Sequence, residues 1–133
     1  LHLSKSKTNK YLNNLVDKFS IKSGNPKAEI STLSGGNMQK LLMGRELTIN
    51  PEVILASQPT RGLDVNSGET IHQLLVEQRN NGSAILLISE DLDELFKLRN
   101  RLLVIFEGKI IQSFEAVEMD ISKVGLAMAG VNG

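Results

Sequence analysis

Three short apolar runs, separated by stretches with helical patterns, constrain the fold more than any other feature of the sequence. The runs contain only Ala, Val, Ile, Leu and Phe and are Val53–Ala56, Ala84–Ile88 and Leu102–Phe106. Strands that are buried on both faces have continuous apolar sequences, whereas strands with one solvated face alternate. A succession of strand and helix from residue 53 to residue 106 is typical of a parallel sheet covered on both faces. The sequence therefore predicts an α/β fold.

The remaining elements are predicted from helical periodicity, capping residues and chain breakers. A helical section precedes the first strand. We expect residues 1–50 to form this helical subdomain and residues 51–133 to form the α/β core. Two helices are expected in the helical subdomain. The first follows a loose lead-in, covers residues 8–19 and is capped by Thr8 or Asn9. After a break at Ser23–Pro26, the second runs from Ser34 to Thr48. Later helices are expected over 67–78 (capped by Asn66 or Ser67), 91–98 and 120–129, and Lys109–Phe114 should form a hairpin with the preceding strand.

Composition and charge exclude several classes of function. The 133 residues allow about one domain. Fifteen Lys plus Arg balance fifteen Asp plus Glu, so we expect no nucleic-acid partner, and the absence of cysteine excludes disulfides and Cys-type zinc sites. The apolar runs are too short to cross a bilayer. Because the chain begins with Leu1 and has no initiator Met, we expect it to be the rear part of a longer protein.

The segment Leu33–Lys40 (LSGGNMQK) carries the clearest chemical signal. Ser34 is placed to cap a helix, and Gly35 and Gly36 leave the backbone N–H groups of the first turn accessible. A helix N-terminus with bare N–H groups and a hydroxyl is suited to bind phosphate. The alternative is a helix start with nothing bound, because capping alone explains the serine.

Several motifs in fixed order resemble the rear half of an ATP-binding cassette of ABC transporters. Leu33–Gln39 is followed by the apolar run at 53–56, by Ser57–Asp64 (SQPTRGLD) and by Ser89–Glu94 (SEDLDE). LSGGNMQK with PTRGLD is most similar to importers for simple sugars and nucleosides, whose ATPase subunit carries two cassettes in tandem. The resemblance covers nearly the whole chain. It implies the C-terminal part of the second cassette: a helical signature subdomain, then a mainly parallel sheet with flanking helices.

The resemblance also implies roles for individual residues. Ser34 and Gly36 would contact the γ-phosphate of ATP held by the opposing cassette, with Gly35, Asn37 and Gln39 in the same signature motif. The D-loop, which crosses the interface between cassettes, matches Gly62, Leu63 and Asp64. Asp64 can also be read as a turn residue or helix cap.

Three positions depart from the family pattern. Ser57 stands where the Walker B motif has the Asp of the Mg²⁺ site, Gln58 where it has the general base, and Glu90 where the switch histidine is expected. A glutamine can orient a water but cannot accept its proton. We therefore expect Ser57 and Gln58 to adjoin nucleotide without catalysis, and no catalytic residue in this chain.

Other candidate residues favour structural roles. Gly125 and Gly130 have the glycine spacing of a phosphate loop, but Val131–Asn132 follow in place of Lys and a hydroxyl residue. We expect both glycines near a helix end. His72 is expected to be a surface or packed residue and His2 to lie in a frayed terminus. The acidic run from Glu90 to Glu94 lacks the glycine of a Ca²⁺ loop and fits a solvated first helical turn.

The resemblance thus implies a nucleotide-binding component of an importer for sugars or nucleosides. ATP and Mg²⁺ would act in the assembled protein, with neither held tightly by this chain alone and no metal site of its own. The implied partners are the N-terminal cassette of the same subunit, membrane permease subunits and, indirectly, a substrate-binding protein, at the cytoplasmic side of the membrane. The chain alone is not expected to hydrolyse ATP. Two alternatives stay open: a non-catalytic interaction or assembly domain, and a cassette of a non-transport ABC ATPase.

Overall fold

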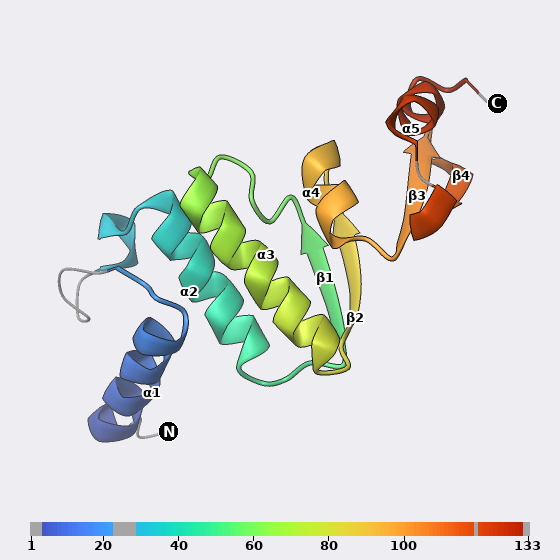
Figure 1. The fold of residues 1–133 in the computed structure, drawn as a ribbon. Helices are drawn as coiled ribbons and strands as arrows, with labels where there is room; N and C mark the ends of the chain where they lie inside the picture. Colours follow the sequence, from blue (N-terminus) through green and yellow to red (C-terminus); the bar gives the residue numbers. More distant parts are fainter. Residues whose placement is uncertain (1–3, 23–28, 119, 132–133) are drawn as a thin grey trace. The chain divides into compact units, whose positions relative to one another are not determined.

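The computed structural model describes residues 4–22, 29–118 and 120–131. The chain divides into two compact units, Leu1–Glu90 and Asp91–Gly133 (Figure 1). The break expected at Ser23–Pro26 and the expected frayed position of His2 lie outside the described residues, and the expected division near residue 50 stays a prediction.

The described residues of the first unit form three α-helices and two strands in the predicted order. They are α1 (Lys5–Lys18), α2 (Gly35–Leu47), β1 (Val53–Ser57), α3 (Val65–Asn80) and β2 (Ala84–Ile88), with a short 3-10 helix at Ile30–Thr32 before α2.

Two of the expected helix starts are wrong. The N-cap of α1 is Ser4, not Thr8 or Asn9. Thr8 lies within the helix, where its backbone N–H and its hydroxyl both donate to the carbonyl of Ser4. The N-cap of α3 is Asp64, not Asn66 or Ser67, because the Asp64 carboxylate accepts the backbone N–H of Ser67. Both helices therefore begin earlier than their apolar periodicity indicates.

The strands β1 and β2 pair in parallel, as predicted, with Val53 opposite Ala84 and Ser57 opposite Ile88. The crossover between them is α3, as in a βαβ unit. Burial alternates along β1: Ile54 and Ala56 are buried, whereas Val53 and Leu55 are 70% and 68% exposed. Leu86 and Ile88 lie on the same open face. Within the described residues only one face of the pair is covered, so the expected cover on both faces is not observed there.

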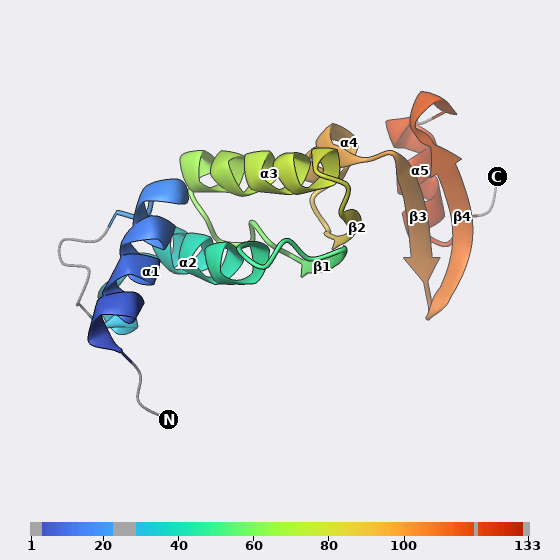
Figure 2. The ribbon, with the colours of Figure 1, turned by 90° about the horizontal axis from the view of Figure 1, so that it is seen from below.

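The core of the first unit lies between the helices and the covered sheet face. Phe19, Leu47 and Ile71 are fully buried, and each such side chain contributes about 1.5–3 kcal/mol by leaving water. The ring of Phe19 lies directly on Gly44 of α2, where an added Cβ would come within 2.7 Å of a ring carbon. α2 and α3 run side by side in both ribbon views (Figures 1 and 2). This packing fixes where the N-terminal ends of α2 and α3 meet.

The second unit contains α4 (Leu92–Leu98), β3 (Arg101–Phe106), β4 (Lys109–Glu115), a 3-10 turn at Ala116–Glu118 and α5 (Ile121–Met128). β3 and β4 form the predicted antiparallel hairpin. Its turn residues Glu107 and Gly108 have φ of 47° and 76°, the left-handed values that tight hairpins need. The third apolar run thus pairs with β4 in a sheet separate from β1 and β2. The chain as a whole is α/β, as predicted.

The helix end in the second unit confirms the reading of Gly130. Gly130 follows the C-cap of α5 with φ of 78°, and an added Cβ would lie 2.7 Å from the Phe106 ring. Gly125 lies inside α5. In the part of the chain that the structure describes, no helix is long and apolar enough to span a membrane.

Candidate functional site

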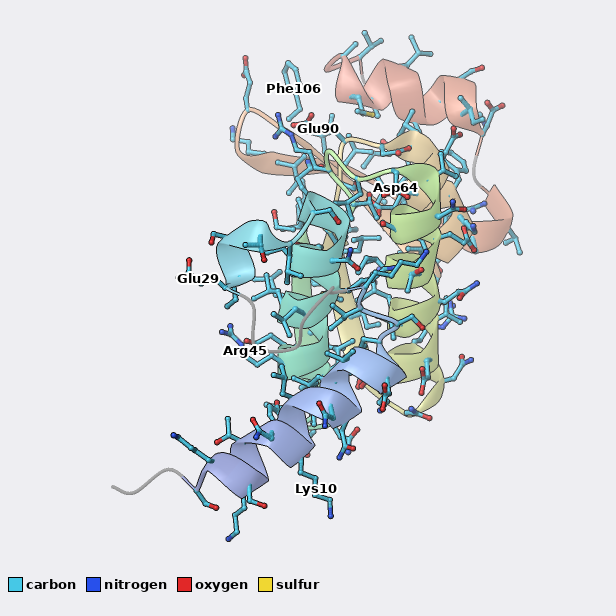
Figure 3. The ribbon with its side chains drawn as sticks, turned by 90° about the vertical axis from the view of Figure 1, so that its left-hand side faces the viewer. Lys10, Glu29, Arg45, Asp64, Glu90 and Phe106 are labelled. Carbon is cyan, nitrogen blue, oxygen red and sulfur yellow. The ribbon has the colours of Figure 1, made fainter. Side chains whose placement is uncertain are left out.

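The residues singled out by sequence gather at one end of the first unit. The N-terminal ends of α2 and α3 lie at the same end as the carboxyl ends of β1 and β2 (Figure 1). Figure 3 shows Asp64 and Glu90 towards this end, with Arg45 and Lys10 towards the other. The signature motif, Ser57, Gln58, the D-loop and Glu90 therefore lie at the same end of the first unit (Figures 1 and 3).

Ser34 caps α2, as the sequence predicts. Its Oγ accepts hydrogen bonds from the backbone N–H of Asn37 (3.4 Å) and from the Asn37 side-chain Nδ2 (2.9 Å). Ser34 and Gly35 are exposed, and an added Cβ at Gly35 would meet nothing within 4 Å. The start of α2 is thus an open helix N-terminus with a hydroxyl at its edge, which is an arrangement suited to an anion. Gln39 follows, half-buried, in the same helix.

Gly36 is buried against the D-loop side of the unit. An added Cβ would lie 2.8 Å from the Ser67 Cβ and 3.5 Å from Asp64 Oδ2. The signature motif therefore packs against Ser67, which is hydrogen-bonded to Asp64 of the D-loop. Sequence reasoning identified both motifs but not Ser67 as their link, because the contact comes from the packing of α2 on α3 and leaves no local sequence signal.

Asp64 is held by hydrogen bonds within its own turn. Its Oδ1 accepts the backbone N–H of Ser67 (2.9 Å) and its Oδ2 accepts the Ser67 hydroxyl (2.8 Å). The backbone bond first, and then the hydroxyl bond, lower the pKa of Asp64 below its ordinary value. The preceding turn uses Gly62 at φ of 73°. Leu63 is half-buried and donates its N–H to the carbonyl of Thr60 (3.1 Å).

The carboxyl end of β1 holds Ser57 and Gln58. Ser57 is exposed. Gln58 is half-buried at φ of 48° and donates its backbone N–H to the carbonyl of Ile88 (2.7 Å). A non-glycine residue in this region carries about 1–3 kcal/mol of backbone strain, and such strain often marks functional sites. Glu90 is exposed and follows β2 at the same end.

The donor set here is poor for a metal. Within residues 4–22, 29–118 and 120–131, no group of three His, Asp or Glu side chains could hold a metal ion. His72 is largely buried, with its Nδ1 3.9 Å from a carboxylate oxygen of Glu69. This placement is consistent with the expectation that His72 is a surface or packed residue.

The curated relatives match 77% to 98% of the chain, while the chain spans about a quarter of their length or less. It is 42% identical over 128 residues (96% of the chain, 25% of the relative) to the guanosine import ATP-binding protein NupO of Bacillus subtilis. It is 42% identical over 103 residues (77% and 19%) to the glucose import ATP-binding protein TsgD13 of Haloferax volcanii. It is 37% identical over 130 residues (98% and 26%) to the nucleoside import ATP-binding protein NupA of Lactococcus lactis. No family model matches the chain.

Solved structures share the fold. The ATP-binding cassette MJ0796, in a dimeric post-hydrolysis state bound to ADP and Pi, aligns with a TM-score of 0.73 and 25% identity, over 87% of this chain and 50% of that chain. An ATP-binding subunit of an ABC transporter aligns with a TM-score of 0.74 and 16% identity, over 96% of this chain and 56% of that chain.

Proposed function

We propose that this chain supplies the signature motif to the ATP site of a partner cassette. The chain is homologous to ATP-binding proteins of sugar and nucleoside import and has the fold of an ABC cassette. Its own nucleotide site is proposed to be catalytically degenerate. The protein that contains it is then the ATP-binding component of an importer for sugars or nucleosides.

The observation that carries the proposal is the open start of α2. The Ser34 oxygen accepts two hydrogen bonds from Asn37, so its hydrogen is available to an outside acceptor. Gly35 beside it leaves the backbone open to close approach. Both features fit a phosphate group, which carries acceptor oxygens and negative charge. Ser34 and Gly36 are the proposed contacts, and Gly35, Asn37 and Gln39 shape the motif.

Degeneracy of the chain's own site is supported by the groups at the ends of β1 and β2. Ser57 brings a neutral hydroxyl where a carboxylate would hold hydrated Mg²⁺, and Gln58 cannot take a proton from water. Glu90 adds a negative charge that opposes binding of a γ-phosphate. These residues do not fit a magnesium site, and we propose that they adjoin nucleotide without turnover.

The likeness to importer ATP-binding proteins supports a proposed assembly. Residues 1–50 are proposed as part of the signature subdomain and residues 51–133 as part of the ATPase core. The D-loop residues Gly62, Leu63 and Asp64 would face the N-terminal cassette of the same subunit, and permease subunits would hold the pair at the cytoplasmic side of the membrane. A substrate-binding protein would act indirectly. ATP, held with Mg²⁺ at the partner's site, would supply the phosphoanhydride bond whose hydrolysis drives transport.

Two substitutions in the assembled importer test the proposal. Ser34→Ala should lower steady-state ATP turnover, because the partner site loses a phosphate donor. Gln58→Glu should change turnover little, because the missing Asp and histidine functions are not restored. The reverse ranking would contradict the assignment. If neither substitution changes turnover, the alternative of a non-catalytic assembly domain is favoured.

A further inference from the structure

We propose that Asn37 is a positioning residue that keeps the hydroxyl hydrogen of Ser34 directed away from α2 and towards a bound phosphate. This inference rests on the proposed contact between Ser34 and ATP. It assigns to Asn37 a role through Ser34 rather than a phosphate contact of its own.

The orientation of the Asn37 amide is fixed by a distant part of the chain. Asn37 Oδ1 accepts the backbone N–H of Lys22 at 2.8 Å. Because a backbone N–H can only donate, the group facing it must be the amide oxygen. The NH₂ group of Asn37 therefore faces the other way, towards Ser34, and donates to Ser34 Oγ at 2.9 Å.

The two donors from Asn37 determine what Ser34 can offer. A serine hydroxyl has two acceptor positions and one hydrogen. The side-chain Nδ2 and the backbone N–H of Asn37 occupy both acceptor positions. The hydroxyl hydrogen must then point away from Asn37, and Ser34 is an exposed residue. A hydroxyl arranged in this way is a donor to an incoming anion without any reorientation, which is how preorganised donors strengthen binding of developing charge.

The same bridge ties the start of α2 to the segment after α1. Ile21 is buried and donates its backbone N–H to the carbonyl of Val16 at 3.0 Å. These contacts hold Ile21 in place, and the backbone of Lys22 is the next one along the chain. The amide of Asn37 is thus held on one side by the segment after α1, and on the other side it donates to Ser34. An ordinary helix cap needs only the backbone N–H of Asn37 and makes no such demand on the side chain.

Asn37→Asp separates these two contacts in the assembled importer. The carboxylate still accepts from the Lys22 N–H but cannot donate to Ser34, so the Ser34 hydroxyl would turn and donate to the carboxylate. We expect kcat for ATP hydrolysis to fall about tenfold, the effect of losing one hydrogen bond to a charged group. In a Ser34→Ala background, Asn37→Asp should lower kcat less than about twofold, because no hydroxyl remains to be oriented.

The double-mutant cycle also controls for added charge. An equal loss from Asn37→Asp in both backgrounds would overturn the inference, because a charge or folding effect does not need Ser34. If Ser34→Ala itself leaves kcat unchanged, the proposed function fails instead. Where Asn37→Asp lowers the thermal midpoint too far for assay, Asn37→Ala takes its place in the same cycle: loss of kcat only when Ser34 is present supports the positioning role, and loss in both backgrounds overturns it.

Discussion

Gly36 of α2 lies so close to Ser67 of α3 that an added Cβ would come within 2.8 Å of the Ser67 Cβ. Ser67 in turn donates its hydroxyl to the carboxylate of Asp64, the cap of α3. The start of α2 and the cap of α3 are therefore parts of one packed contact. A shift of the signature end relative to α3 must change the surroundings of Asp64.

Gly36→Ala is predicted to destabilise the protein. The methyl group meets the Ser67 side chain, and overpacking of this kind costs about 1–3 kcal/mol. Urea unfolding of the purified protein measures the change. Gly35→Ala is the matched control, since its Cβ meets nothing within 4 Å and a helical Gly→Ala change is neutral or stabilising by up to about 1 kcal/mol. Equal stabilities of the two variants would contradict the packing.

Sequence reasoning located most elements because their signals are local. Ser34 before two glycines predicts the start of α2, and the three apolar runs predict β1, β2 and β3. The start of α3 is harder to predict: Asp64 is a possible cap, but the apolar periodicity begins after Asn66 and Ser67 and so favours those two residues.

The contacts that define the site are not local, and the sequence does not predict them. The Asn37 side chain accepts a hydrogen bond from the backbone N–H of Lys22, which lies in the segment between α1 and α2. Ser67 meets Gly36 only because α2 packs on α3. A continuous apolar run such as Val53–Ala56 predicts burial on both sides, but it cannot say which residues provide the cover, and within the described residues one face of β1 is open.

The pKa of Asp64 is predicted to lie below its ordinary value and to rise in Ser67→Ala. The substitution removes the hydroxyl donor but keeps the backbone N–H, which makes the larger contribution, so the rise should be partial. Carboxyl titration by NMR measures both values. An unchanged pKa in Ser67→Ala would show that the hydroxyl bond is not formed in solution.

The same hydrogen bonds predict a pH dependence of stability. A carboxyl whose pKa is lowered on folding stabilises the fold above its unfolded pKa, near 4, and this contribution is lost as the pH falls through the folded value. The stability difference between the protein and Asp64→Asn should therefore shrink as the pH is lowered below about 4. Thermal midpoints over this pH range measure it, and a difference that is constant with pH would count against the cap.

Gly130→Ala is predicted to destabilise the second unit. Alanine is disfavoured at φ of 78°, and its Cβ would lie 2.7 Å from the Phe106 ring. The combined strain and overpacking should cost about 1–3 kcal/mol in urea unfolding. Gly125→Ala in α5 is the control, because nothing lies within 4 Å of its Cβ. A loss of stability in the control that matches Gly130→Ala would show that the helix end is not the cause.

The isolated chain of 133 residues is predicted to show no Mg-ATP hydrolysis above background. Ser57 brings no charged ligand for Mg²⁺, and Gln58 cannot remove a proton from the attacking water. The phosphate-binding end of α2 is proposed to serve a site that a partner cassette must complete. Release of inorganic phosphate measures the rate, and Gln58→Ala is the matched variant. A steady rate that Gln58→Ala abolishes would mean that this chain has a working site of its own.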